Sequence, residues 1–196
     1  MPVVLIAASA GGIEALHEVL GALPRTFGAA VVIVQHRGPD RQSLLARVLA
    51  RASALPVIDA RDGDRLAAGT IYVAKADQHL TIDAAGAFQY VDGRRIRHVL
   101  SSANPLFASA AAALGPRAIA VVLTGSGMDA TDGVQAIKTH GGVVIAQDRA
   151  TSAHFGMPGA AIETGVVDYV IPLAAVAPTL VRLVTERAAS TASHAS

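Results

Sequence analysis

Three side chains of catalytic type stand at the ends of apolar runs, far apart in the chain. They are Ser9 in Ala-Ala-Ser-Ala-Gly-Gly, His36 in Val-Ile-Val-Gln-His and Asp129 in Leu-Thr-Gly-Ser-Gly-Met-Asp. A hydroxyl, an imidazole and a carboxylate in contact provide the nucleophile of acyl transfer, its general base and the partner that orients the base. The three residues therefore predict a serine-hydrolase triad, provided that the fold brings them together.

The segments around these residues alternate short runs rich in Val and Ile with runs of helical spacing, which is typical of βαβ units. Strands are expected at 3–7, 30–34, 70–74, 80–82, 87–91, 118–123, 143–146 and 167–171. Residues 83–86 read as a hairpin loop, and the closing helix is expected from 173 to about 186. The predicted fold class is α/β, with a doubly wound, mostly parallel sheet flanked by helices and a small antiparallel hairpin.

This topology offers a way for the three side chains to meet. Successive parallel strands joined by one helix are commonly neighbours, about 4.8 Å apart. Ser9 and His36 are separated by one strand–helix–strand unit, and Asp129 follows a third strand. Because open α/β sheets bind their ligands at the carboxyl ends of the strands, we expect all three side chains at that edge.

Backbone N–H groups beside these residues could hold the oxyanion of an acyl-transfer reaction. Ser9 precedes an expected helix start, where N–H groups have no intrahelical partner, and a glycine-rich turn precedes Asp129. One such donor is typically worth about 3 kcal/mol in the barrier. The candidate oxyanion and substrate-binding residues are Ala10, Gly11, Ser126, Gly127 and Met128.

Each triad candidate also has a structural interpretation that the spacing leaves open. A serine before two glycines is often a helix N-cap or part of a phosphate-binding loop. His36 could be a loop or substrate-contact histidine, and Asp129 a turn former with which Asp132 competes. A dinucleotide site is disfavoured because the pattern Gly-x-Gly-x-x-Gly is absent. Surface or structural positions without metal-ligand spacing are expected for His17, His79, His98, His140 and His154.

Composition restricts the classes of function. The length of 196 residues fits one domain, and 52% hydrophobic with 16% charged residues is typical of a folded globular protein. A net charge of +1 disfavours binding to nucleic acid or to membranes by electrostatic attraction. The lack of cysteine excludes disulfides, thiolate metal sites and a cysteine nucleophile. Neither a signal peptide nor an apolar run of about 18 residues is recognisable, so a cytoplasmic protein without membrane insertion is expected.

Six ordered blocks of sequence resemble the catalytic domain of the chemotaxis protein-glutamate methylesterases, the CheB family. The most specific are Ala-Ser-Ala-Gly-Gly-Ile-Glu-Ala-Leu (8–16), Val-Gln-His (34–36) and Leu-Thr-Gly-Ser-Gly-Met-Asp (123–129). The other three span residues 62–74, 145–148 and 150–158, so that the resemblance runs from Val3 to about Val184. A single domain over 1–187 with a poorly ordered tail at 188–196 is expected.

The resemblance implies that Ser9, His36 and Asp129, which fall on the family's three motif positions, form a serine-hydrolase triad. It implies hydrolysis of glutamate 5-methyl esters on chemoreceptors with release of methanol, and deamidation of receptor glutamines by some members. It implies no metal and no organic cofactor.

Three departures from the family pattern are visible. Ala10 stands where threonine is common, and Ser126 stands where methionine is common. The segment His-Arg-Pro-Ser-x-Asp reads Val-Leu-Ser-Ser-Ala-Asn at 99–104, which bears on substrate recognition more than on chemistry.

The chain also starts at the catalytic domain, so the usual receiver domain is not expected, and a separate receiver protein could take over its regulatory role. The altered segment at 99–104 and the missing receiver domain motivate an alternative hypothesis. On that reading the chain is a redirected or non-enzymatic signalling module that keeps the fold and binds a protein partner.

Overall fold

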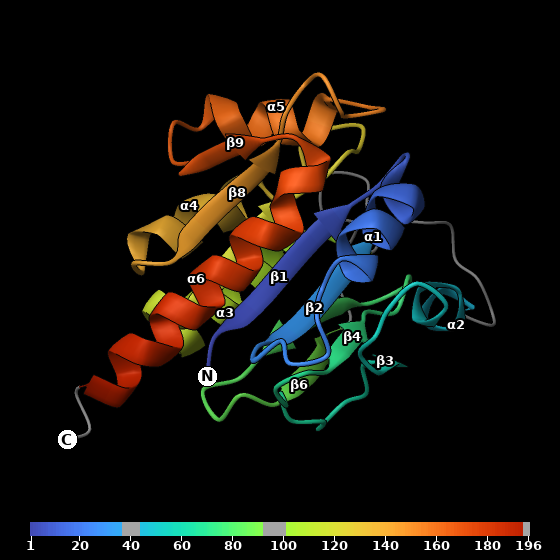
Figure 1. Ribbon diagram of the computed structural model, residues 1–196. Helices are drawn as coiled ribbons and strands as arrows, with labels where there is room; N and C mark the ends of the chain where they lie inside the picture. Colours follow the sequence, from blue (N-terminus) through green and yellow to red (C-terminus); the bar gives the residue numbers. More distant parts are fainter. Residues whose placement is uncertain (37–43, 92–100, 194–196) are drawn as a thin grey trace.

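A seven-stranded parallel sheet forms the centre of the molecule, in the order β3-β4-β2-β1-β7-β8-β9 (Figure 1). The computed structural model describes residues 1–36, 44–91 and 101–193. The strands of this sheet are β1 (Val3–Ala8), β2 (Ala30–Gln35), β3 (Val57–Asp59), β4 (Ile71–Val73), β7 (Ala118–Val122), β8 (Val143–Gln147) and β9 (Tyr169–Ile171). A separate antiparallel pair consists of β5 (His79–Ile82) and β6 (Phe88–Val91). The predicted fold class is confirmed.

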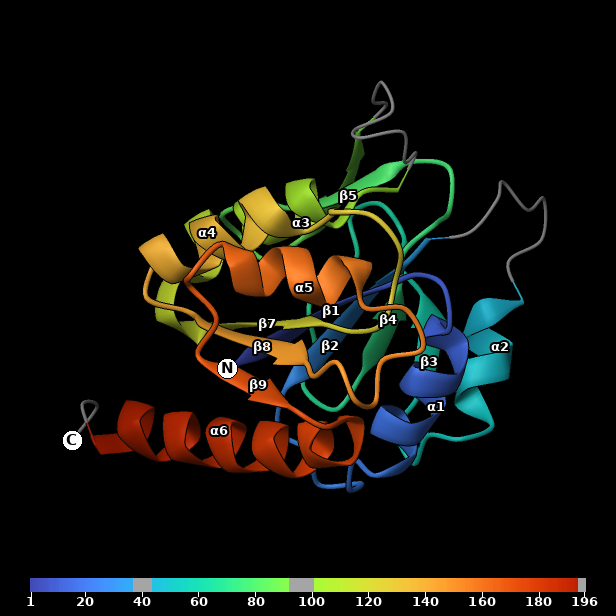
Figure 2. The ribbon, with the colours of Figure 1, turned by 90° about the horizontal axis from the view of Figure 1, so that it is seen from above.

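Helices cover both faces of the sheet (Figure 2). One face carries α1 (Gly12–Gly21), α2 (Leu45–Ala50) and α6 (Leu173–Ser193), which share one hydrophobic cluster with the sheet. The other face carries α3 (Ala103–Leu114), α4 (Thr131–Thr139) and α5 (Gly156–Glu163), which share a second cluster with the sheet and with the β5–β6 pair. A short 3₁₀ turn (Gly115–Arg117) leads from α3 into β7.

The central strand β1 is apolar at every position because it is buried on both faces. All six of its residues are buried. Val3, Leu5 and Ala7 belong to the cluster beneath α3–α5, whereas Val4, Ile6 and Ala8 belong to the cluster beneath α1 and α6. A strand that is covered on both faces has to be apolar at every position.

Two elements differ from the expected pattern. The edge strand β3 was not predicted, because it has only three residues and leaves Ile58 and Asp59 exposed, so that its sequence lacks the signal of a buried strand. Helix α6 continues to Ser193 instead of ending near Glu186.

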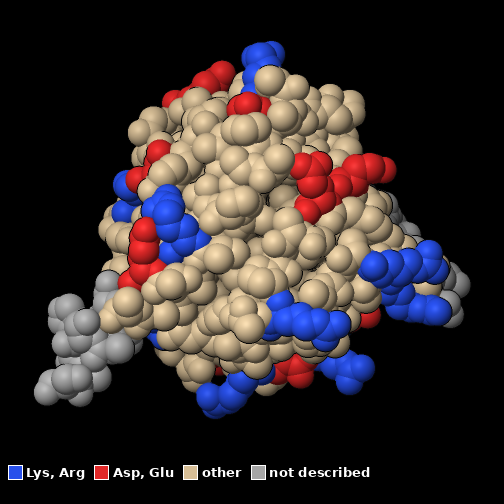
Figure 3. Space-filling model, in the orientation of Figure 1, with Lys and Arg blue, Asp and Glu red and all other residues tan. Residues whose placement is uncertain are grey.

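The surface above α1 and α6 carries basic and acidic side chains in several small groups rather than in one patch of a single sign (Figure 3). Among the described residues, no helix combines the length and the apolar content that crossing a bilayer would require.

Candidate active site

Ser9 and His36 follow the ends of two neighbouring parallel strands. The register of β1 and β2 pairs Ala8 with Gln35, and the His36 N–H donates to the carbonyl of Ala8 at 2.9 Å. The two catalytic candidates are therefore the next residues along the same register. The expectation that Ser9 and His36 meet at the carboxyl edge of the sheet is confirmed at the level of the backbone.

The backbone of Ser9 is fixed on two sides. Its N–H donates to the carbonyl of Thr124 at 3.0 Å, which joins the end of β1 to the loop after β7. Its carbonyl accepts the N–H of Gly12 at 2.8 Å, at the start of α1. The half-buried hydroxyl makes no hydrogen bond to any other described residue. Ser9 is thus not a side-chain N-cap of α1, and its hydroxyl is left to react.

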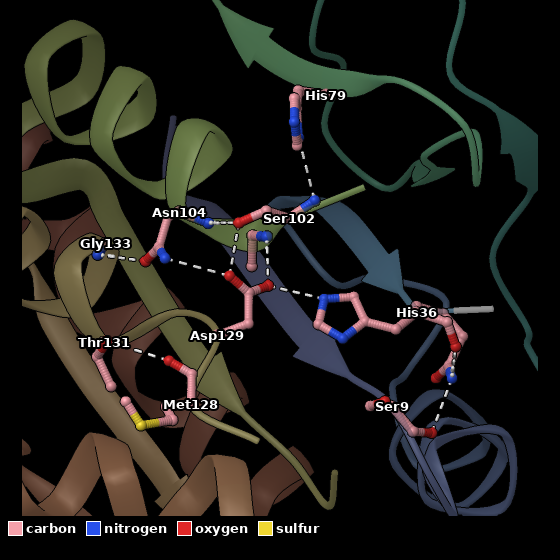
Figure 4. Close-up of polar contacts among 11 residues, drawn as sticks. Ser9, His36, His79, Ser102, Asn104, Met128, Asp129, Thr131 and Gly133 are labelled. Carbon is pink, nitrogen blue, oxygen red and sulfur yellow. Dashed lines mark hydrogen bonds and ion pairs between the residues drawn. The ribbon is translucent and has the colours of Figure 1, made fainter. Parts of the chain in front are cut away.

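His36 and Asp129 form a hydrogen-bonded pair, with 2.7 Å between Nε2 and Oδ2 (Figure 4). An ionised carboxylate can only accept, so Nε2 carries the hydrogen and Nδ1 is the basic nitrogen. In Figure 4 the ring lies between Asp129 and Ser9, with its second nitrogen on the side of Ser9. No hydrogen bond between the Ser9 hydroxyl and the ring is present among the described contacts, so that this last link of the triad stays a prediction.

Asp129 is only 3% exposed and accepts four hydrogen bonds (Figure 4). The donors are His36 Nε2, Ser102 Oγ at 2.5 Å, the Ala103 N–H at 2.6 Å and Asn104 Nδ2 at 3.2 Å. Burial alone would raise the pKa of Asp129, but the hydrogen bonds from His36, Ser102 and Ala103 outweigh it and hold that pKa below its usual value of 3.8. Asp129 is therefore a buried anion that can stabilise an imidazolium.

The start of α3 supplies three of these donors, and the sequence analysis did not assign them. Ser102 is the N-cap of α3, and its hydroxyl accepts the Asn104 N–H while it donates to Asp129. The Asn104 side chain also accepts the Gly133 N–H at 2.8 Å, which connects α3 to α4. A helix N-terminus favours negative charge, so α3 adds to the stabilisation of this carboxylate.

The departure at 99–104 therefore bears on the chemistry and not mainly on substrate recognition. Val99 and Leu100 lie outside the described residues. A serine, a small residue and asparagine before proline are the signal of a helix start that could have pointed to Ser102 and Asn104.

The turn after Asp129 is strained. Ala130 is buried and has φ of 77°, the left-handed conformation that costs a non-glycine residue about 1 kcal/mol or more. Its carbonyl accepts the N–H of Val134 in the first turn of α4. Such strain is retained where the surrounding structure fixes a side chain, and here the neighbouring side chain is Asp129.

The two predicted oxyanion turns both lie against Ser9. Gly11, with φ of 74°, begins α1 as its N-cap. On the other turn, a Cβ added at Gly125 would stand 2.8 Å from the Cβ of Ser9, so that only glycine allows this approach. On these two turns, the N–H groups without a hydrogen-bond partner among the described residues are those of Ala10, Gly11, Ser126, Gly127 and Met128. Their role as oxyanion donors stays a prediction.

A cleft of about 510 Å³ adjoins the second turn. Its lining includes Gly127 and Met128 of that turn and also Phe155, over whose ring the Arg149 guanidinium is stacked at 4.3 Å. Met128, which is 52% exposed, is accessible beside the proposed reaction centre.

Of the remaining histidines, His79 is buried, and its Nδ1 accepts the N–H of Ser102. His79 therefore holds the N-cap of α3 in place and is not part of the His36–Asp129 pair. Asp132 lies in the first turn of α4 and is exposed, and none of the hydrogen bonds described for His36 involves it. The ambiguity between Asp129 and Asp132 is thus resolved in favour of Asp129 as the partner of His36.

Known proteins resemble this chain over nearly its whole length. The catalytic domain of the CheB methylesterase from Thermotoga maritima superposes with a TM-score of 0.89 at 37% identity, covering 93% of this chain and 98% of that one. The protein-glutamate methylesterase/protein-glutamine glutaminase of Pyrococcus abyssi is 39% identical over 92% of this chain, and that of Moorella thermoacetica 42% identical over 93%.

The chain spans about half the length of these two curated relatives, 50% and 44% respectively. A sequence profile of the family described as CheB methylesterase matches residues 4–180. The match extends over nearly the whole described fold and includes all three catalytic candidates. The chain belongs to the CheB methylesterase family.

Proposed function

We propose that this protein is a serine-type hydrolase that cleaves glutamate 5-methyl esters on a chemoreceptor or a receptor-like protein and releases methanol. The observation that carries the proposal is the buried His36–Asp129 pair beside the Ser9 hydroxyl, which has no hydrogen-bond partner among the described residues. The names of the relatives from Pyrococcus abyssi and Moorella thermoacetica support the choice of ester.

In the proposed reaction, the Ser9 oxygen attacks the carbonyl carbon of the ester while His36 Nδ1 takes the hydroxyl proton. Asp129 stabilises the imidazolium that forms. The tetrahedral intermediate then collapses, the bond to the methoxy oxygen breaks, and His36 returns its proton to give methanol. Water, deprotonated by the same imidazole, attacks the acyl-enzyme and restores Ser9 together with a free glutamate carboxylate.

The oxyanion of both intermediates needs donors close to Ser9. On the turns after Ser9 and after Gly125, several N–H groups have no hydrogen-bond partner among the described residues, and Gly125 lies against Ser9, which favours both turns for this role. The same steps with an amide substrate would release ammonia, so deamidation of receptor glutamines is proposed as a second activity. The glutaminase part of the relatives' names supports it.

The rival hypothesis of a non-enzymatic signalling module is disfavoured by the order of the site. Catalysis needs a serine hydroxyl at the end of β1 next to a histidine that a buried carboxylate orients, whereas a domain that only binds a partner does not require this combination. Control by a separate receiver protein and a cytoplasmic location stay predictions.

Methanol release from a methylated chemoreceptor tests the proposal. The wild-type protein should release methanol, and Ser9→Ala should abolish the release while it leaves the fold intact. Ser53→Ala changes a serine whose hydroxyl accepts the Leu55 N–H and has no other hydrogen bond to a described residue. This variant is the matched control and should keep full activity. Full activity of Ser9→Ala would end the assignment.

A further inference from the structure

Gln35 joins the two residues that the proposed reaction uses first. It is the last residue of β2, stands directly before His36 and is 6% exposed. Its Nε2 donates to the carbonyl of Ser9 at 2.8 Å and to the carbonyl of His36 at 3.0 Å. We propose that Gln35 is a positioning residue whose single amide nitrogen sets the spacing between the nucleophile and its base. This inference rests on the proposed function.

The hydrogen bonds fix the orientation of the amide. Both hydrogens of Nε2 are used, one on each carbonyl, so a flipped amide would direct its oxygen at two other oxygens. Oε1 then lies buried with no hydrogen-bond partner among the described residues. Buried polar atoms are nearly always paired, and an exception calls for an explanation. Bridging Ser9 and His36 is the explanation that the contacts offer.

The same sheet contains a second buried glutamine, whose side-chain amide is satisfied at both ends. Gln147 ends β8 and is fully buried. Its Oε1 accepts the Thr124 N–H, and its Nε2 donates to Thr151, so that both ends of the amide are satisfied. Gln35 instead leaves its oxygen unpaired and gives both hydrogens to the catalytic candidates. The Gln147 amide joins the loop after β7 to the loop after β8, whereas the Gln35 amide joins the backbones of Ser9 and His36.

The chain also makes room for this amide. A Cβ added at Gly12 would stand 2.2 Å from Gln35 Oε1 and 2.8 Å from the Cβ of Ala8. Glycine at this position lets the first turn of α1 lie directly over the amide. Gly12→Ala should therefore displace Gln35 without removing any of its donor groups. Because the Gly12 N–H itself donates to the Ser9 carbonyl, this variant complements the substitutions of Gln35 and does not replace them.

The test measures the labelling of Ser9 by a fluorophosphonate probe in the full chain. The labelled fraction at completion counts the competent sites, and the rate constant at saturating probe reports the reactivity of each site. Gln35→Met keeps the length of the side chain and removes both hydrogen bonds, and Gln35→Asn keeps an amide that is too short to reach both carbonyls. Both variants should lower the rate constant by about 10-fold to 100-fold, the effect of an error of about 1 Å in positioning.

Leu180→Ala is the matched control for stability. Leu180 is buried in α6, in the cluster beneath α1, and takes part in none of the hydrogen bonds described for the site. This variant should lower the melting temperature and leave the rate constant per competent site unchanged. Gln35→Met should show the opposite pattern, with a reduced rate constant in a protein whose labelled fraction stays near that of the wild type.

Two outcomes would overturn the inference. One is an unchanged rate constant in the folded Gln35 variants and in Gly12→Ala. The other is a loss of labelled fraction alone, as in Leu180→Ala, which would show a structural role. The wild-type protein separates this result from a failure of the proposed function, because a chain without a reactive Ser9 would not be labelled at all.

Discussion

His36 uses Nε2 to reach Asp129 Oδ2, at 2.7 Å, and leaves Nδ1 on the side of Ser9 (Figure 4). In the chymotrypsin-type triad the two nitrogens have the opposite assignment, with Nδ1 on the carboxylate and Nε2 on the serine. The chemistry is the same, because either nitrogen of a neutral imidazole can accept a proton when the other donates. What changes is the tautomer that the protein must hold.

The tautomer of His36 can be measured. At neutral pH, His36 should carry its hydrogen on Nε2, because the ionised carboxylate accepts from that nitrogen. Long-range ¹H–¹⁵N spectra distinguish protonated from unprotonated ring nitrogens and identify the tautomer directly. A neutral ring with its hydrogen on Nδ1 would contradict the arrangement.

Asp129→Asn should lower turnover on the order of 10⁴-fold while the protein stays folded, because an amide can donate to Nε2 and stabilise the wrong tautomer. Asp132→Asn, three residues along the chain in α4, is the control and should retain activity. Methanol release under saturating substrate is the measurement. Comparable losses in both variants would mean that Asp129 has no special role.

Ser102→Ala should destabilise the protein in a way that depends on pH. The pKa of Asp129 is lowered from 3.8 on folding, so its ionised form contributes stability above that value, and the contribution is lost as the pH falls through the lower folded pKa. Losing the Ser102 donor raises the pKa of Asp129 in the folded state. Because this is a hydrogen bond to a charged group, its loss should lower the free energy of unfolding at pH 7 by about 1.5–3 kcal/mol. The loss of the helix cap adds about 1 kcal/mol that does not depend on the ionisation of Asp129.

Urea unfolding of Ser102→Ala at pH 7 and at pH 3 is the measurement, and the difference from the wild type should be smaller at pH 3. Ser109→Ala removes a serine of the same helix that bonds Ile82 and Pro105 instead of Asp129. Ser109→Ala should lower the free energy of unfolding by a similar amount at both pH values. An equal cost of Ser102→Ala at both values would show that Ser102 acts only as a cap.

Gly125→Ala should slow the reaction by displacing Ser9. The added Cβ would stand 2.5 Å from Met157 Sδ and 2.8 Å from Ser9 Cβ, and although the methionine can move, the serine is held by its backbone bonds. A loss of about 1–3 kcal/mol in the free energy of unfolding is expected from overpacking. Gly28→Ala is the control, since its nearest atom would be 3.9 Å away. Equal activity of the two variants in the methanol assay would show that Ser9 tolerates the change.

The sequence could predict the parallel sheet and the placement of Ser9 and His36 because both depend on strand periodicity alone. Residues at the ends of neighbouring parallel strands meet whatever the helices between them contain. The start of α3 could not be placed in the same way. Ser102 and Asn104 reach Asp129 across a long separation in sequence, and nothing in their spacing shows which carboxylate they bind.

Gln35 illustrates a second limit of the sequence. Its place at the end of β2 was predictable, but the direction of its amide depends on the carbonyls of Ser9 and His36, which only the folded backbone presents. The edge strand β3 was not predicted for the opposite reason. It is too short and too exposed to leave a pattern.

Mapping the fluorophosphonate adduct by mass spectrometry tests the central claim most directly, because it asks which atom of the protein is the nucleophile. We predict one adduct, on Ser9, that is absent from Ser9→Ala and forms far more slowly in His36→Ala. An adduct on a different residue, or undiminished labelling of the folded His36→Ala protein, would contradict the account.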